Sequence, residues 1–174
     1  MNPKFSLAVA AFALSILTST AQISVIAHRG YWKTKGSAQN SITGLTKADK
    51  IKCYGSEFDV WITADDQLVV NHDPTYNNVN LQYANYDTDV KPLTLSNGEK
   101  LPLLRDFLTK AKKLKTKLIL EIKAHKEKER TMACVDKTLE LIKELGLEDR
   151  VTYISFSYQA CIALKQKSPA GTES

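Results

Sequence analysis

The stretch SEFDVWITADDQLVVNHD, residues 56–73, reads as a strand, a tight polar turn and a second, shorter strand. Side chains two residues apart along a strand point to the same face. Glu57 and Asp59 therefore share one face, while the apolar residues between and after them form the other. The second strand ends at His72, so the turn returns a histidine towards the two carboxylates. Because unpaired charge is costly to bury, this arrangement indicates a functional site.

Three further segments are short and rich in β-branched or apolar residues, which predicts buried strands. These segments are ISVIAH (23–28), KLILEIK (117–123) and VTYISFS (151–157), and they join the strand SEFDVWI (56–62). Helical patterns occupy 39–53, 102–115 and 127–145, and a fourth begins near Tyr158. Pro102 is placed to open the second helix and Gly146 to end the third. Strands that alternate with helices predict a parallel sheet with right-handed crossovers.

One gap between the predicted strands is much longer than the others. It holds the hairpin strand QLVVNH and then a segment rich in Tyr and Asn, residues 74–100. This segment is predicted to be an insertion over the strand ends, where functional loops usually lie. Four βα units make half of a (β/α)8 barrel, which needs about 250 residues. We therefore expect an α/β chain that covers roughly the N-terminal half of such a barrel.

The first 21 residues have the pattern of a secretory signal peptide. Lys4 supplies the positive start, residues 5–17 form an apolar run, and the small residues 19–21 predict cleavage after Ala21. The run is too short to span a bilayer comfortably. Residues 22–174 are therefore expected to form one domain of an exported protein, periplasmic or secreted, without a stable membrane anchor.

Composition and charge are ordinary for a globular protein, with 43% hydrophobic and 25% charged residues and a net charge of +5. Lys and Arg gather between residues 110 and 130 without interleaved aromatic residues, which favours solvated helix faces over nucleic-acid binding. Cys53, Cys134 and Cys161 lack C-x-x-C spacing and nearby histidines, so a zinc site is not expected. Buried free thiols are the prediction.

The strand KLILEIK repeats the pattern of the first stretch. Glu121 and Lys123 share a face, and the C-terminal ends of parallel strands meet at one edge of the sheet. Glu57, Asp59 and Glu121 should therefore converge, where mutual repulsion and desolvation would be costly. A divalent cation relieves both, and oxygen ligands select Mg²⁺ or Ca²⁺. The alternative is a set of edge charges paired with Lys123 and surface lysines.

The sequence AHRG, residues 27–30, closes the first predicted strand. Arg29 could grip a phosphate group with two hydrogen bonds, and Gly30 would let the backbone turn tightly. His28 and His72 would then flank the same mouth of the sheet. Two histidines beside a metal and an arginine can supply a general base and a general acid for phosphoryl transfer.

In combination and in order, HRG, EFDVWITADDQLVVNHDPT and LILEIK resemble the glycerophosphodiester phosphodiesterase family. The resemblance covers residues 26–123, and VTYISFS fits the family's next strand. It implies a TIM barrel that hydrolyses glycerophosphodiesters to an alcohol and glycerol 3-phosphate with a divalent metal, Mg²⁺ or Ca²⁺.

The resemblance also implies roles for single residues. The matches are Glu57, Asp59 and Glu121 as metal ligands, His28 and His72 as the acid/base pair, Arg29 as a phosphate contact and Lys123 as a further charge near the phosphate. We expect His28 to be the base and His72 the acid. The chain departs from the family at Ala38-Gln39-Asn40, where Pro-Glu-Asn is common, and a helix-opening role is the alternative for Asn40.

Two other functions remain open. A related phospholipase-type phosphodiesterase on the same scaffold would need an apolar rim, for which Tyr76, Tyr83 and Tyr86 are the candidates. A catalytically inactive binding protein is the other, because an open four-stranded sheet exposes two edges. Three explanations fit the short length: a truncated gene product, which we favour, an incomplete sequence, or a homodimer in which two copies close the barrel.

Overall fold

The computed structural model describes residues 23–168, so the predicted signal peptide, residues 1–21, lies outside the described residues. Its main sheet has five strands, and four of them are parallel. In spatial order they are β1 (Ile26–Ala27), β2 (Gly55–Ile62), β6 (Lys117–Ile122) and β7 (Val151–Ile154), and β3 (Leu68–Val70) pairs antiparallel with β2. All four predicted parallel strands are therefore present, but the first and the last are shorter than predicted.

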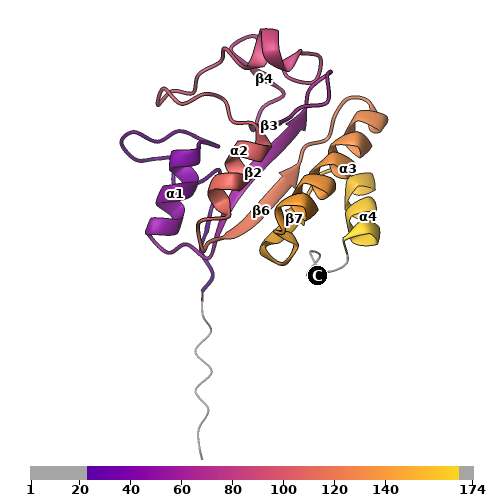
Figure 1. The fold of residues 1–174 in the computed structure, drawn as a ribbon. Helices are drawn as coiled ribbons and strands as arrows, with labels where there is room; N and C mark the ends of the chain where they lie inside the picture. The colour runs from indigo at the N-terminus through magenta and orange to yellow at the C-terminus, as the bar shows by residue number, and fades with distance from the viewer. Residues whose placement is uncertain (1–22, 169–174) are drawn as a thin grey trace, which may run out of the picture.

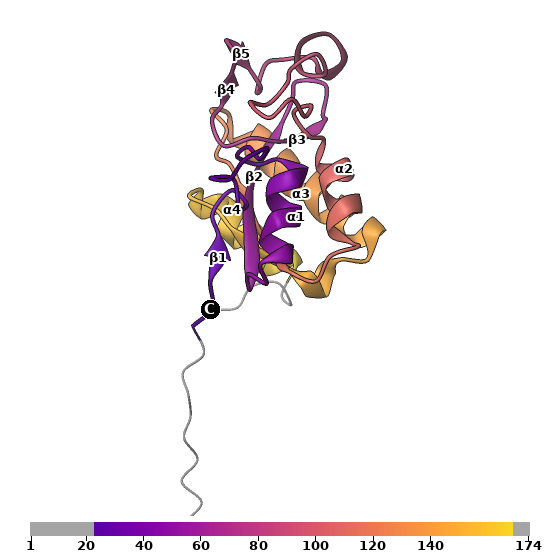
Figure 2. The same ribbon diagram turned by 90° about the vertical axis from the view of Figure 1, so that its left-hand side faces the viewer.

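Four helices accompany the sheet, near the predicted positions. They are α1 (Ile42–Lys50), α2 (Leu104–Ala111), α3 (Lys128–Leu145) and α4 (Tyr158–Lys167), and a short 3₁₀ turn, η2 (Glu148–Arg150), precedes β7. The helices α1, α2 and α3 lie along one face of the sheet, and α4 packs beside α3 (Figures 1 and 2). Phe58 and Phe107 meet in the core between the layers, with ring centroids 4.6 Å apart. The apolar face predicted for β2 is thus the face that packs against the helices.

The helix ends explain where the predicted boundaries were wrong. The helix α1 begins after Ser41, whose hydroxyl accepts a hydrogen bond from the Gly44 backbone N–H at 2.9 Å. Asn40 is therefore not the residue that caps this helix. Pro102 lies two residues before α2, outside the helix that it was expected to open. Gly146 does end α3, with a left-handed φ of 64°.

The insertion, residues 74–100, stands over the C-terminal ends of the strands (Figure 1). It contains a small hairpin, β4 (Thr75–Tyr76) with β5 (Val79–Asn80), and one π-helical turn, η1 (Tyr86–Val90). A second apolar cluster joins it to the sheet, because Trp61 and Val69 pack with Leu81 and Val90. This packing fixes the insertion above the strand ends that carry the candidate site.

The face of the sheet opposite α1, α2 and α3 remains open. Among residues 23–168, β1 and β7 each have a strand neighbour on one side only. Apolar side chains near these edges are exposed, namely Ile26, Ile154 and Phe156 at 45%, 40% and 90%. None of the helices described among residues 23–168 has the length and hydrophobicity of a membrane span.

The three cysteines are unpaired, as predicted, but they differ in burial. Cys134 is fully buried, and burial raises the pKa of its thiol to about 12. Cys53 is half-buried, whereas Cys161 is exposed on α4. The expectation of a buried thiol was therefore wrong for Cys161. The helix α4 packs through Ala160 and Leu164, and Cys161 lies on its exposed side.

Candidate active site

Three carboxylates converge at the C-terminal ends of two neighbouring strands. Glu57 and Asp59 come from β2 and Glu121 from β6, and the parallel register sets Asp59 directly opposite Glu121. All three side chains are buried, and one oxygen of each lies within 4.8 Å of the others. This is the convergence expected from the alternation of side chains along both strands.

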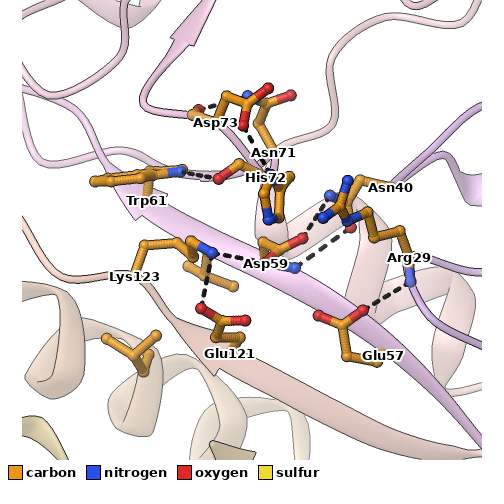
Figure 3. Close-up of polar contacts among 12 residues, drawn as sticks. Arg29, Asn40, Glu57, Asp59, Trp61, Asn71, His72, Asp73, Glu121 and Lys123 are labelled. Atoms are coloured by element: carbon orange, nitrogen blue, oxygen red, sulfur yellow. Dashed lines mark hydrogen bonds and ion pairs between the residues drawn. The ribbon is translucent and has the colours of Figure 1, made fainter. Parts of the chain in front are cut away.

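Lys123 lies between two of these carboxylates (Figure 3). Its Nζ is 2.7 Å from Glu121 Oε1 and 3.2 Å from Asp59 Oδ1. Burial lowers the pKa of Lys123, but the hydrogen bond to Glu121 and the charge of Asp59 outweigh this effect, so the pKa is raised. The predicted pairing of edge charges with Lys123 is therefore real, but it compensates two carboxylates with one ammonium group.

Glu57 is the one of the three carboxylates with no lysine or arginine nitrogen within 4.0 Å in the described part of the chain. Its Oε2 accepts a hydrogen bond from the Arg29 backbone N–H at 2.7 Å, and its Oε1 is buried without a partner among residues 23–168. Burial, together with the charges of Asp59 and Glu121, raises the pKa of Glu57 to about 7, although the Arg29 backbone N–H and the Arg29 charge both act to lower it. Carboxylate oxygens short of positive charge are suitable ligands for a divalent cation, and these three residues could hold one.

Asp59 is held from the side by two asparagines. Asn40 donates from Nδ2 to Asp59 Oδ2 at 2.9 Å and accepts the Asp59 backbone N–H through Oδ1 at 3.3 Å. The Asn71 backbone N–H donates to the Asp59 carbonyl at 3.1 Å. These bonds replace a missing strand neighbour, because β1 pairs with β2 only as far as Ser56 and β3 pairs from Val60 onward.

The role of these asparagines was missed by the sequence analysis. Asn40 was considered for opening a helix, and Asn71 received no role. The available signal was that Asn40 is the one residue of Ala38-Gln39-Asn40 that agrees with the family pattern. Its contact with Asp59 crosses 19 residues of sequence, so neither helical nor strand periodicity could indicate it.

The turn after β1 brings Arg29 to Glu57. Arg29 and Gly30 both have positive φ, 57° and 78°, which aims the Arg29 backbone N–H at the carboxylate. A Cβ on Gly30 would lie 2.8 Å from the Gly44 carbonyl carbon, so only glycine fits this turn against α1. The Arg29 guanidinium donates to Gln39 Oε1 at 2.7 Å, and its buried Nε has no partner within residues 23–168.

Both predicted histidines lie at this edge of the sheet. His28 is exposed, with a side-chain exposure of 70%, and its Nε2 is 3.9 Å from Glu57 Oε2. His72 Nδ1 is 2.8 Å from Asp73 Oδ1, and Figure 3 shows the ring directed towards Asp59. Asp73 therefore orients the His72 ring and leaves its Nε2 for other partners. The sequence analysis did not anticipate this contact between His72 and Asp73.

The third histidine, His125, has a structural role. The Ile62 backbone N–H donates to its Nε2 at 3.1 Å, so the proton resides on Nδ1, which donates to the Lys123 carbonyl at 3.0 Å. Burial lowers the pKa of His125, and the neutral ring packs edge-on against Trp61. His125 thus links the end of β2 to the backbone of Lys123, directly after β6.

A sequence model of the glycerophosphoryl diester phosphodiesterase family matches residues 28–172. The chain is also 28% identical over 169 residues to a glycerophosphodiester phosphodiesterase of Caldanaerobacter subterraneus subsp. tengcongensis, with 83% of this chain and 63% of the relative covered. An uncharacterized protein of Bacillus subtilis, YqiK, is 27% identical over 157 residues with the same coverage. The chain thus spans less than two thirds of the length of these relatives.

Solved structures give the same result for the fold. A glycerophosphodiester phosphodiesterase from Parabacteroides distasonis superposes with a TM-score of 0.82 at 49% identity, over 84% of this chain and 61% of that one. An Oleispira antarctica phosphodiesterase, solved with its product sn-glycerol-3-phosphate, superposes with a TM-score of 0.72 at 23% identity, over 84% and 63%. The sheet and its helices therefore correspond to part of a TIM barrel.

Proposed function

Because the chain belongs to the glycerophosphoryl diester phosphodiesterase family, we propose that it acts in the hydrolysis of glycerophosphodiesters to an alcohol and glycerol 3-phosphate. One observation carries this proposal: three buried carboxylates, Glu57, Asp59 and Glu121, meet Lys123 at strand ends flanked by two histidines. A structural salt-bridge cluster would balance its charges, whereas this cluster has an excess of carboxylates.

We propose that the three carboxylates are the metal ligands. Their donor set consists of oxygen atoms, and the buried Glu57 Oε1 lacks a partner among the described residues, which fits Mg²⁺ or Ca²⁺. A bound divalent cation would neutralise the charge that grows on the phosphate in the transition state. Asn40 would keep Asp59 in a fixed orientation through its two hydrogen bonds.

The remaining side chains divide between the phosphate and the protons. Arg29 has a buried Nε without a partner among the described residues, and Lys123 carries an ammonium group beside the carboxylates. Both can therefore donate hydrogen bonds to phosphate oxygens. His28 is proposed as the general base and His72 as the general acid. Asp73 fixes the orientation of His72, so that its Nε2 can give a proton to the departing alcohol.

The phospholipase alternative receives less support. Of its three candidate rim residues, Tyr76 and Tyr86 pack against the second apolar cluster, and Tyr83 alone is exposed, at 55%. Its hydroxyl donates to Glu127, which is not one of the three clustered carboxylates. A small, water-soluble diester therefore fits this mouth better than a lipid does.

The test is the release of glycerol 3-phosphate from purified glycerophosphodiesters with Mg²⁺, with Ca²⁺ and with EDTA. We expect release that depends on the metal and is lost in Glu57→Ala. Glu144→Ala is the matched control, because Glu144 is an exposed carboxylate paired with Arg105 on the helical layer. Release that persists in EDTA or in Glu57→Ala would contradict the metal role, and no release from a folded sample would favour an inactive binding protein.

We also propose that the protein is exported. The N-terminal residues have the charge and apolar pattern of a signal peptide, and cleavage after Ala21 would leave Gln22 as the first residue. N-terminal sequencing of the protein recovered outside the cytoplasm tests this proposal. An intact Met1 on the recovered protein would contradict it.

A further inference from the structure

Beside the carboxylates lies a cavity of about 420 Å³, between the loop that follows β1 and the base of the insertion. It adjoins the candidate active site, because Asn40 and His72 belong to its lining. The cavity is also lined by Trp32, Lys33, Gln39, Asp73, Tyr76 and Ser96. A cavity with aromatic walls and a few polar groups is the usual form of a small-molecule site.

We propose that this cavity binds the alcohol part of the substrate and selects uncharged polyols, such as glycerol or inositol, over cationic alcohols. The proposal rests on the proposed function. The position of His72 indicates which part of the substrate lies there. Its Nδ1 is held by Asp73, so Nε2 donates the proton, and the alcohol that receives this proton departs on the side of His72.

The polar groups of the cavity suit hydroxyl groups. The second carboxylate oxygen of Asp73, the amide nitrogen of Gln39 and the hydroxyl of Ser96 have no hydrogen-bond partner among residues 23–168. They offer an acceptor, a donor and a group that can act as either, which is what adjacent hydroxyls require. Trp32 and Tyr76 supply flat apolar faces for the carbon skeleton of the polyol.

The charges of the cavity disfavour a cationic alcohol. Lys33 Nζ lies 5.2 Å from the centre of the Trp32 ring, so a positive charge already stands beside this aromatic wall of the cavity. A second cation there would meet like-charge repulsion.

The experiment compares kcat/KM for four diesters of glycerol 3-phosphate, with inositol, glycerol, choline and methanol as the alcohol. We expect the polyol diesters to be preferred over the choline diester by about tenfold or more. Trp32→Ala should lower kcat/KM for the inositol diester by about tenfold, the equivalent of one lost stacking contact, and lower kcat/KM for the methyl diester much less, because methanol has no carbon skeleton to stack on the ring. Lys33→Gln should narrow the difference between inositol and choline, while Lys35→Gln, a neighbouring exposed lysine, should not.

Equal or better cleavage of the choline diester would overturn the proposal, and so would an equal loss for all diesters in Trp32→Ala. Saturation-transfer NMR with free myo-inositol and free choline gives a second readout that does not need turnover. Inositol binding that Trp32→Ala abolishes, without cleavage of any diester, would support the cavity and refute the proposed function. Cleavage without polyol preference or inositol binding would refute the cavity alone.

Discussion

Glu57 has the least favourable electrostatic surroundings of the three site carboxylates. It is buried near Asp59 and Glu121, it is compensated by the Arg29 backbone N–H and in smaller part by the Arg29 charge, and its pKa rises to about 7. In the absence of a metal, the folded chain therefore resists ionisation of this group. The protein keeps a carboxylate there at a cost in stability, as expected for a residue retained for binding rather than for folding.

The cost of Glu57 predicts a pH-dependent stability in EDTA. Between its ordinary pKa of 4.5 and the raised value of about 7, the folded chain holds a proton that the unfolded chain has released. The free energy of unfolding therefore falls as pH rises through this window. Glu57→Gln should be more stable than the wild type by on the order of 2 kcal/mol at pH 8 and nearly equal at pH 4.5, as measured by urea denaturation. Parallel pH profiles for the two proteins would contradict this prediction.

The histidines should affect turnover more than substrate binding. His28→Ala and His72→Ala are each expected to lower kcat by about 10² to 10⁴-fold with a much smaller change in KM, because each would remove a proton transfer. His125→Gln is the control, because His125 joins two backbone segments by hydrogen bonds. This variant should have a lower melting temperature, while the kcat of its folded fraction stays unchanged. Unchanged turnover in both alanine variants would refute the acid/base roles.

At the scale of elements, two glycines with positive φ serve different purposes. Gly146 ends α3 with φ 64° and has open space around it, whereas Gly30 has φ 78° and lies against the backbone of Gly44. The first needs glycine for its backbone conformation alone. The second needs it for the conformation and for the space, because the turn after β1 is pressed onto the first turn of α1.

The pair gives a prediction with an internal control. Gly146→Ala should lower the free energy of unfolding by about 1 kcal/mol, the conformational cost of a left-handed alanine. Gly30→Ala should cost more, about 2 to 4 kcal/mol, because its Cβ would lie 2.8 Å from the Gly44 carbonyl carbon. It should also weaken metal binding by displacing the Arg29 N–H from Glu57. Chemical denaturation measures the free energy of unfolding of both variants. An equal decrease in the two would show that the turn after β1 can shift to accommodate the added Cβ.

The strands and the carboxylate cluster were predictable from sequence, because both follow from a period of two. Asp59 opposite Glu121 needs only the alternation of side chains and a parallel register. The supporting contacts were not predictable in this way. Asn40 reaches Asp59 from a loop, and Asp73 pairs with His72 within a turn, so local side-chain geometry decides both contacts. Helix boundaries shifted for a related reason, since the capping hydroxyl of Ser41 outweighed the apolar pattern around it.

At the scale of the whole molecule, the open sheet face has unpaired strand edges and exposed apolar side chains. The backbone edges of β1 and β7 and the exposed Ile26, Ile154 and Phe156 lie along it. Unpaired edges and exposed apolar side chains favour association with another chain. A homodimer, one of the three explanations that the sequence analysis gave for the short length, would cover this face.

Sedimentation velocity over a range of concentrations tests that association. We expect the wild-type chain to form larger species as concentration rises, and Ile154→Lys to reduce this association by placing a charge at the β7 edge. Ile51→Lys is the matched control, because Ile51 is similarly exposed, at 53%, but lies at the end of α1. A monomer at every concentration would contradict the homodimer, and equal effects of the two variants would show that the open face is not the contact.

The candidate site is assembled from one contact that is local in sequence, the β2–β3 hairpin that carries His72, and one that is distant, between Asp59 and Lys123. This difference in sequence separation sets an order for their formation. The hairpin that carries His72 pairs Ile62 with Leu68, whereas Lys123 and Asp59 meet across 64 residues that include the whole insertion. Closing a long loop costs more entropy and slows the formation of its contacts. During refolding, the histidine should therefore be in place before the carboxylates come together. A luminescent lanthanide bound by the carboxylates would then time the docking of β6 onto β2.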